Sequence, residues 1–196
     1  MKKLALTLLF LAATARATTV VPPDFPALVN KSDYIVRAVV KSVTVEERTM
    51  PARTQMIFSL VELQVKQVIA GRPPSPLVLT VLGGKLNGRE LAIEGAPQFT
   101  VGDEAIYFVQ GNGRQIYPLT SMMHGLYPIR KEKGTGREYV SRSNGMPLRA
   151  VNEVARALAD APAAPSRGQL AAQALSPGDF AQGIRAAAQA AHLREK

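Results

Sequence analysis

The chain has 196 residues, with 24 lysines and arginines against 15 aspartates and glutamates, and a formal net charge of +9. It contains no cysteine, which excludes disulfides, zinc–thiolate sites, a cysteine nucleophile and a lipidated N-terminal cysteine. Its length is sufficient for one domain with a substantial hydrophobic core.

The first residues have the three-part layout of a secretory signal. Met1-Lys2-Lys3 is positive, residues 4–15 form an apolar run too short to span a bilayer, and Ala15-Arg16-Ala17 has small residues where signal peptidase reads them. We therefore expect residues 1–17 to be a signal peptide cleaved after Ala17 and the protein to be exported, to the periplasm or the medium. The signal removes three cations and no acid, so the mature chain keeps a charge of +6.

A proline-rich, extended lead-in is expected over 20–26, and from residue 34 the sequence has the pattern of β-strands. β-Branched residues alternate with polar ones, and turn residues recur about every ten positions. The expected strands, in chain order, are 34–45, 56–69, 77–82, 104–110 and 115–119, followed by a hairpin with arms 125–129 and 138–140.

Alternation along these strands indicates which side chains are buried. On the first strand, Val39 should share a face with Val43 and Val45; on the second, Val61, Leu63 and Val65 should face inward. The predicted core residues are Val39, Val61, Leu63, Val65, Leu79, Ile106, Phe108 and Ile129.

The composition changes after Gly145. Apolar residues recur at helical spacing over 148–158, an Ala/Pro linker covers 161–166, and Ser176-Pro177-Gly178-Asp179 is typical of a helix start. Phe180 and Ile184 should lie on one face of that last helix. We therefore divide the mature chain into a β-barrel domain, 18–146, and a helical C-terminal extension, 147–196.

Short strands without strand–helix alternation favour a mainly β fold. The predicted architecture is a small antiparallel β-barrel, closed or partly closed, with C-terminal helices. No later segment has eighteen consecutive apolar residues, so we expect no membrane span.

Several blocks resemble a set of small exported bacterial proteins of mostly uncharacterised function. The most distinctive block is Phe99-Thr100-Val101-Gly102-Asp103-Glu104-Ala105-Ile106-Tyr107-Phe108-Val109. The other similar blocks, in chain order, are Ser32–Val40, Val68–Gly71, His124–Ile129 and Leu175–Arg185. The resemblance covers most of 32–185 and implies a fold more than a function.

The order of these blocks also resembles the oligonucleotide/oligosaccharide-binding (OB) type of β-barrel found in tissue inhibitors of metalloproteinases and netrin-like modules. Those inhibitors insert an N-terminal cysteine into the zinc site of a protease. Here the expected mature N-terminus is Thr18 and the chain has no cysteine. The resemblance therefore does not carry that mode of inhibition to this chain.

Candidate catalytic residues are few. The two histidines are His124, which we expect at the surface or rim, and His192, near the chain end. Ser121 lies near His124, but no Gly-x-Ser-x-Gly motif accompanies them. Gly83–Gly88 lacks the spacing of a phosphate loop and suits a turn at a barrel corner. Asp103-Glu104 should point to opposite faces of a strand, and the acids show no metal-loop pattern.

The segment Arg130–Arg137 is basic and is flanked by Tyr127 and Tyr139. Exposed aromatic residues beside positive charge could stack with bases, but export removes the usual nucleic-acid partner. An anionic envelope polymer or lipid head group is the alternative ligand for this segment.

We assign no catalytic, cofactor or metal residues and expect no cofactor. The favoured hypothesis is a non-enzymatic exported domain that binds a protein partner, for which an exported protease is suggested by fold analogy alone. The expected contact lies near Lys85–Gln98 and Ser121–Tyr127. The alternatives are a binder of anionic envelope polymer or lipid at Arg130, Lys131 and Lys133, and a hydrolase acting through His124.

Overall fold

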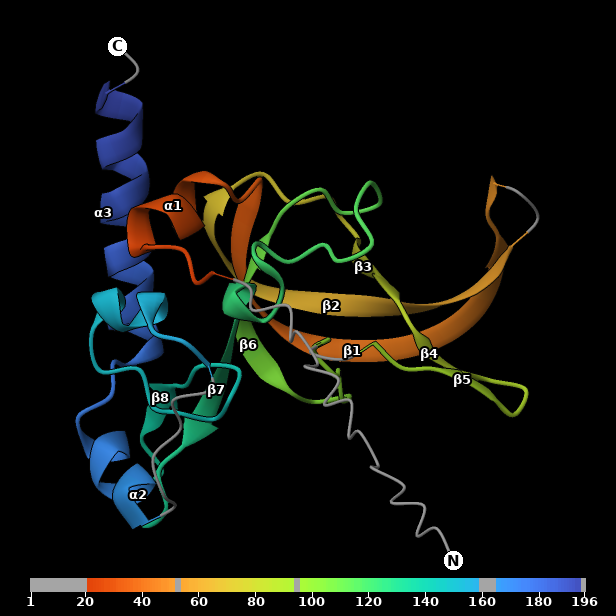
Figure 1. The fold of residues 1–196 in the computed structure, drawn as a ribbon. Helices are drawn as coiled ribbons and strands as arrows, with labels where there is room; N and C mark the ends of the chain where they lie inside the picture. Colours follow the sequence, from red (N-terminus) through yellow and green to blue (C-terminus); the bar gives the residue numbers. More distant parts are fainter. Residues whose placement is uncertain (1–20, 52–53, 94–95, 159–164, 195–196) are drawn as a thin grey trace, which may run out of the picture.

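The computed structural model describes residues 21–51, 54–93, 96–158 and 165–194, so the expected signal peptide lies outside the described residues. The fold is mainly β, as predicted (Figure 1). The strands are β1 (Tyr34–Thr49), β2 (Gln55–Gly71), β3 (Leu77–Leu82), β4 (Gly84–Leu86), β5 (Arg89–Leu91), β6 (Glu104–Val109), β7 (Leu126–Lys131) and β8 (Glu138–Val140). The helices are α1 (Phe25–Asn30), α2 (Pro165–Ala172) and α3 (Pro177–Arg194), with 3-10 helices η2 (Met122–Gly125) and η3 (Val151–Ala155).

Six strands form one antiparallel sheet in the order β3-β2-β1-β6-β7-β8. β4 and β5 form a separate two-stranded hairpin that contacts β1 and β2. The predicted hairpin of β7 and β8 is confirmed, with Arg130 opposite Tyr139. The strand predicted over 115–119 is wrong, because that segment contributes only a single bridge between Val109 and Leu119.

The predicted barrel is also wrong, because no described residues of β3 and β8 pair with each other and the sheet stays open. Each of these strands instead finds other partners. The backbone of Val140 in β8 bonds to Leu148 and Leu175, and Leu82 in β3 bonds to Ile116 in the loop after β6. Closure was therefore not needed to satisfy these backbone groups.

A β-bulge changes which side chains of β1 face the core. The register of β1 against β2 shifts between Val40 and Ser42, which leaves Lys41 as an extra residue. An extra residue moves all following side chains to the opposite face. Val43 consequently packs with Val40 rather than with Val39, and Val39 is half-buried.

The sheet buries residues on both faces. The helix-side core includes Ile35, Ile106 and Phe108, and the inner core, on the opposite face, includes Val61 and Leu79. Of the eight predicted core residues five are buried and three are half-buried, so the prediction that most are buried is confirmed. The half-buried ones are Val39, Val65 and Ile129.

Two helices cover the helix-side face, α1 and α3 (Figure 1). α1 replaces the end of the expected extended lead-in. Its first turn is capped by Asp24, whose Oδ1 accepts a hydrogen bond from the Ala27 N–H at 2.7 Å. The predicted start of α3 is confirmed, because Ser176 Oγ accepts a hydrogen bond from the Asp179 N–H at 3.1 Å.

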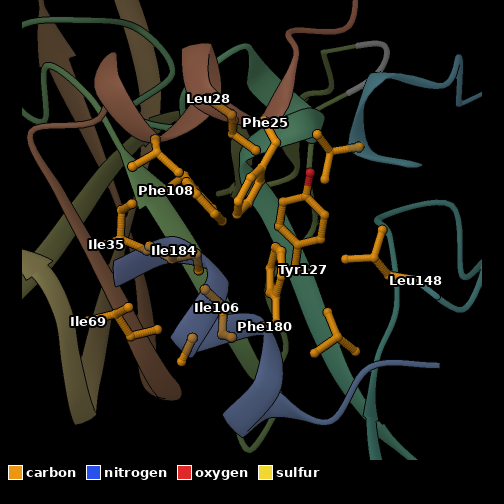
Figure 2. Packing of buried hydrophobic residues seen from close by; sticks show 14 residues of the cluster. Phe25, Leu28, Ile35, Ile69, Ile106, Phe108, Tyr127, Leu148, Phe180 and Ile184 are labelled. Carbon is orange, nitrogen blue, oxygen red and sulfur yellow. The ribbon is translucent and has the colours of Figure 1, made fainter. Parts of the chain in front are cut away.

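Four aromatic rings join these helices to the sheet (Figure 2). The Phe180 ring of α3 lies 5.0 Å from Tyr127, 5.9 Å from Phe25 and 6.0 Å from Phe108, measured between ring centroids. Phe108 and Tyr127 themselves meet edge to face at 5.4 Å. Each such pair adds about 0.5–1.5 kcal/mol beyond simple burial. Phe180 and Ile184 share one buried face, as predicted.

The rest of the C-terminal extension differs from the helical expectation. Within 148–158 only Val151–Ala155 is helical, as a 3-10 turn. The predicted linker, 161–166, falls outside the described residues except for its last two positions, which begin α2. Among the described residues, no helix is long and apolar enough to cross a membrane.

Phe108 is fully enclosed in the helix-side core. Replacing Phe108 with Ala should therefore lower the free energy of unfolding by about 3–5 kcal/mol, because it leaves a cavity under α3. Urea denaturation monitored by circular dichroism measures this difference. The control is Val101→Ala, since Val101 is 61% exposed and its truncation should change stability by less than about 0.5 kcal/mol.

Candidate functional site

The inner face of the sheet is hollowed by two neighbouring pockets, which we call the first and second pockets. The first has a volume of about 300 Å³ and lies against Val40, Tyr107 and Leu126. The second has a volume of about 220 Å³ and lies between Val43 and the β4–β5 hairpin. Residues 96–99 line both pockets. Residues 96–99 thus form a wall that the first and second pockets share.

The shared wall is held by an aromatic stack. The half-buried Phe99 ring lies 6.5 Å from the Tyr107 ring, at an interplanar angle of 17°. Burial, with the nearby charges of Asp103 and Glu104, raises the pKa of Tyr107 well above its usual value. The Tyr107 phenol is therefore neutral at physiological pH and forms part of the pocket wall.

Polar groups of both kinds surround the first pocket. Ser143 lines this pocket, and its Oγ is buried with no hydrogen-bond partner among the described residues. Asp103 and Arg130 are exposed and also line this pocket. The first pocket therefore combines an apolar floor with a hydroxyl and one charge of each sign.

Glu104, the remaining acid of the first pocket, is already engaged. Arg37 Nε donates a hydrogen bond to Glu104 Oε1 at 2.5 Å, and Arg37 Nη2 donates to Glu138 Oε2 at 2.8 Å. Although burial opposes its charge, these bonds to Glu104 and Glu138 raise the pKa of Arg37. The Arg37 cluster ties β1 to β6 and β8 and engages one carboxylate oxygen of Glu104.

The two segments expected to bind a partner, 85–98 and 121–127, meet at the first pocket. Residues 96–98 line one side of it, and Met123 and Leu126 line another. Ser121 and Met122, just before Met123, have left-handed φ angles of 53° and 57°. Such backbone is strained for residues other than glycine and is enriched at functional sites. That this region binds a partner stays a prediction.

His124 is buried, not at the surface or rim as expected. Burial, together with the positive charge of Arg142, lowers the pKa of His124. No acidic side chain in the described part of the chain is hydrogen bonded to His124, although Ser121 is a neighbour in sequence. The hydrolase hypothesis thus gains neither an accessible base nor an orienting carboxylate.

The glycine-rich segment 83–88 forms the β4–β5 hairpin. Gly84 pairs with Leu91, and Asn87 and Gly88 make the turn with φ angles of 49° and 76°. This agrees with the expected turn and differs from a phosphate loop, which would lead into a helix. Within the described ranges, no three His, Asp or Glu side chains gather where they could hold a metal ion.

The basic hairpin of β7 and β8 presents exposed charge, whereas the two tyrosines considered as stacking partners are buried or half-buried. Arg130, Lys131 and Lys133 are exposed, and none of them forms an ion pair with another described residue. Tyr127, by contrast, is 2% exposed and belongs to the helix-side core. Tyr139 is half-buried. The interpretation of Tyr127 as a platform for bases is therefore wrong.

No specific pattern in the sequence predicts the pocket position of Ser143 or the stacking of Phe99 on Tyr107. Phe99 is the only aromatic residue in the sequence between β3 and β6, and this was the one feature that could have singled it out. Ser143 follows the last strand and reaches the pocket only through the turn after β8.

Comparison with known proteins does not identify this site, because no protein family, curated protein or solved structure matches this chain.

The buried state of His124 predicts a pH dependence of stability. Its pKa in the folded protein lies below the usual value of 6.5, so the unfolded chain takes up the proton first. The contribution of neutral His124 to the free energy of unfolding should be fully present above pH 6.5 and should be lost as the pH falls below it. His124→Gln should lose less stability than the wild type between about pH 7.5 and pH 5.5, as measured by urea denaturation. Parallel losses in both proteins would contradict this.

Proposed function

We propose that this protein is an exported, non-enzymatic domain that binds another protein in the hollow of its inner face. The observation that carries the proposal is the pair of adjoining pockets with the common wall 96–99. Their volumes lie at or below the lower limit of about 300 Å³ for small-molecule sites. Pockets of this size suit individual side chains of a partner better than a whole cofactor.

The composition of the hollow supports protein recognition. Apolar side chains provide most of the lining, while Ser143, Asp103 and Arg130 offer directional contacts at the first pocket. Apolar pockets with a few polar groups are typical of the central contacts of protein interfaces. Export rests on the layout of residues 1–17. A partner such as an exported protease rests on the resemblance to metalloproteinase inhibitors, which is an analogy of fold alone.

Affinity capture tests the proposal. The full chain with a C-terminal tag is expressed in the producing cell, recovered from its periplasm or medium, and analysed by mass spectrometry with whatever it retains. Ala96 lines both pockets, so Ala96→Phe should fill their mouths and abolish capture of a stoichiometric protein partner. The matched control is Ala186→Phe, at an exposed position on α3, which should leave capture unchanged. Equal capture by both variants would move the contact away from the hollow.

The exposed cations of the β7–β8 hairpin favour one second candidate function, binding to an anionic envelope polymer or lipid surface. If Arg130, Lys131 and Lys133 are reversed to Glu, retention on an anionic matrix should fall steeply. Retention of the wild type should also fall between about 0.1 and 1 M salt, because the screening length shortens from about 10 to 3 Å.

A control with the same change in net charge separates this site from general charge. Lys31, Lys66 and Arg72 are exposed and form no ion pair with other described residues. Reversing these three to Glu should weaken retention much less than reversing the hairpin. Equal effects of the two triple variants, or a flat salt dependence, would remove this candidate.

A further inference from the structure

The β3 edge of the main sheet is covered by a side chain that imitates a strand. Asn112 Nδ2 donates a hydrogen bond to the Val78 carbonyl at 2.7 Å, and Asn112 Oδ1 accepts one from the Thr80 N–H at 3.2 Å. The Leu82 N–H donates to the Ile116 carbonyl at 3.2 Å. A carboxamide offers the same donor and acceptor as a peptide group, so this edge is closed to further pairing.

The β8 edge is covered by backbone. The Val140 N–H donates to the Leu175 carbonyl at 2.9 Å, and the Leu148 N–H donates to the Val140 carbonyl at 2.9 Å. The chain before α3 therefore blocks this edge. Both ends of the strand order are thus protected in the way that native sheets protect exposed edges.

No described residue covers the second half of β1 in either of these ways. The pairing of β1 with β6 ends at Val39 and Glu104, and the turn at Gly102 and Asp103 bonds to Val40. From Ser42 to Thr49, β2 is the only described strand that pairs with β1. In Figure 1 the β1–β2 ribbon extends well past β6.

One hydrogen bond, together with the register against β2, establishes which backbone groups of this segment point outward. The Met50 N–H donates to the Thr54 carbonyl at 2.8 Å, so Met50 faces β2. The register against β2 has no shift from Ser42 to Thr49, and the direction of the bonds alternates along a strand. Even-numbered residues therefore bond to β2, and the N–H and C=O groups of Val43, Val45, Glu47 and Thr49 point away from it, where no described strand pairs with them.

The bulge at Lys41 explains why the backbone groups of odd-numbered residues point away from β2 in this segment. Before the bulge, the even-numbered Val40 points away from β2, since its N–H donates to the Asp103 carbonyl at 2.9 Å and its carbonyl accepts from Gly102 at 2.9 Å. One extra residue exchanges the inward and outward sets. The open edge thus lies on the side of β1 that pairs with β6, and it begins where the bonds to β6 and to its preceding turn end.

The surroundings of the open edge restrict what can pair with it. Val40 lines the first pocket and Val43 lines the second, so a strand laid along this edge would pass close to both. Residues 42–45 carry no charge. Farther along, Glu47 is already paired with Arg89 at 2.5 Å and Glu46 with Arg48. A helix or a simple anion cannot satisfy alternating donors and acceptors, whereas an extended polypeptide can.

We propose that an extended segment of a partner protein adds to the sheet as a strand along Ser42–Thr49 of β1. Alternate backbone groups of the partner pair with Val43, Val45 and Glu47, and its apolar side chains on one face enter the second pocket. This inference rests on the proposed function and specifies how the partner is recognised. Main-chain bonds supply affinity in such complexes, and the pockets supply selectivity.

The test uses a displayed library of linear peptides of about ten residues, the upper limit of common strand lengths. The library is selected on the full tagged chain, and the strongest binder is synthesised. Val45→Pro removes an outward N–H without removing a bond to β2, and should weaken binding at least about tenfold. Val45→Ala keeps the N–H and shortens the side chain, so it should weaken binding much less. Equal losses for the two variants would overturn the strand geometry.

Amide hydrogen exchange of the wild-type protein tests the same geometry without any substitution. Bound peptide should slow exchange at Val43, Val45 and Glu47, which are free at the edge. Thr44 and Glu46 already bond to β2 and should change little. A bound peptide that leaves the three edge amides unprotected would overturn the proposal.

Failure of strand addition is distinguishable from failure of the proposed function. If no linear peptide is selected, strand addition is overturned, while capture by the wild type and its loss in Ala96→Phe still test the inner hollow. Sedimentation velocity of the free protein tests a second copy as the occupant. A dimer that Val45→Pro dissociates would assign the edge to self-association and would likewise overturn the proposal.

Discussion

The insertion of Phe180 between Phe25, Phe108 and Tyr127 is the contact on which the rest of the structure depends. It brings together the first helix, two central strands and the last helix, which are remote in sequence. All four side chains are less than 10% exposed, so removing any of them would expose a large apolar surface. The chain has no cysteine, so no disulfide holds these elements together and side-chain packing must do so.

Because both helices occupy one face of the sheet, the opposite face is left to the loops. Those loops cover it incompletely: the β4–β5 hairpin and residues 96–99 cross the inner face and leave a pocket on each side. The bulge at Lys41 contributes in two ways. It directs Val43 toward the inner core, and it places free backbone groups of β1 beside the same pockets.

Location of the candidate site could be anticipated better than its chemistry. The segments 85–98 and 121–127 are expected at the open end of a barrel; the sheet forms no barrel, but residues of both segments line the first pocket. Loops carried by a rigid sheet commonly form binding sites. The residues that shape the pockets were not identified. Tyr107 is placed at the first pocket by strand pairing and Ser143 by the turn after β8, and no local pattern indicates either approach.

The sequence by itself determined the elements with strong local patterns. Alternation predicted β1, β2, β3 and β6, glycines between alternating segments predicted the β7–β8 hairpin, and Ser176 marked the start of α3. Tertiary structure alone decided the open sheet and the faces of β1 beyond Lys41, whereas α1 has a local start signal in its Asp24 cap. An edge stays open or is covered according to contacts such as Asn112 with Val78, and a bulge depends on the partner strand. These are long-range pairings, whereas periodicity and capping are properties of neighbouring residues.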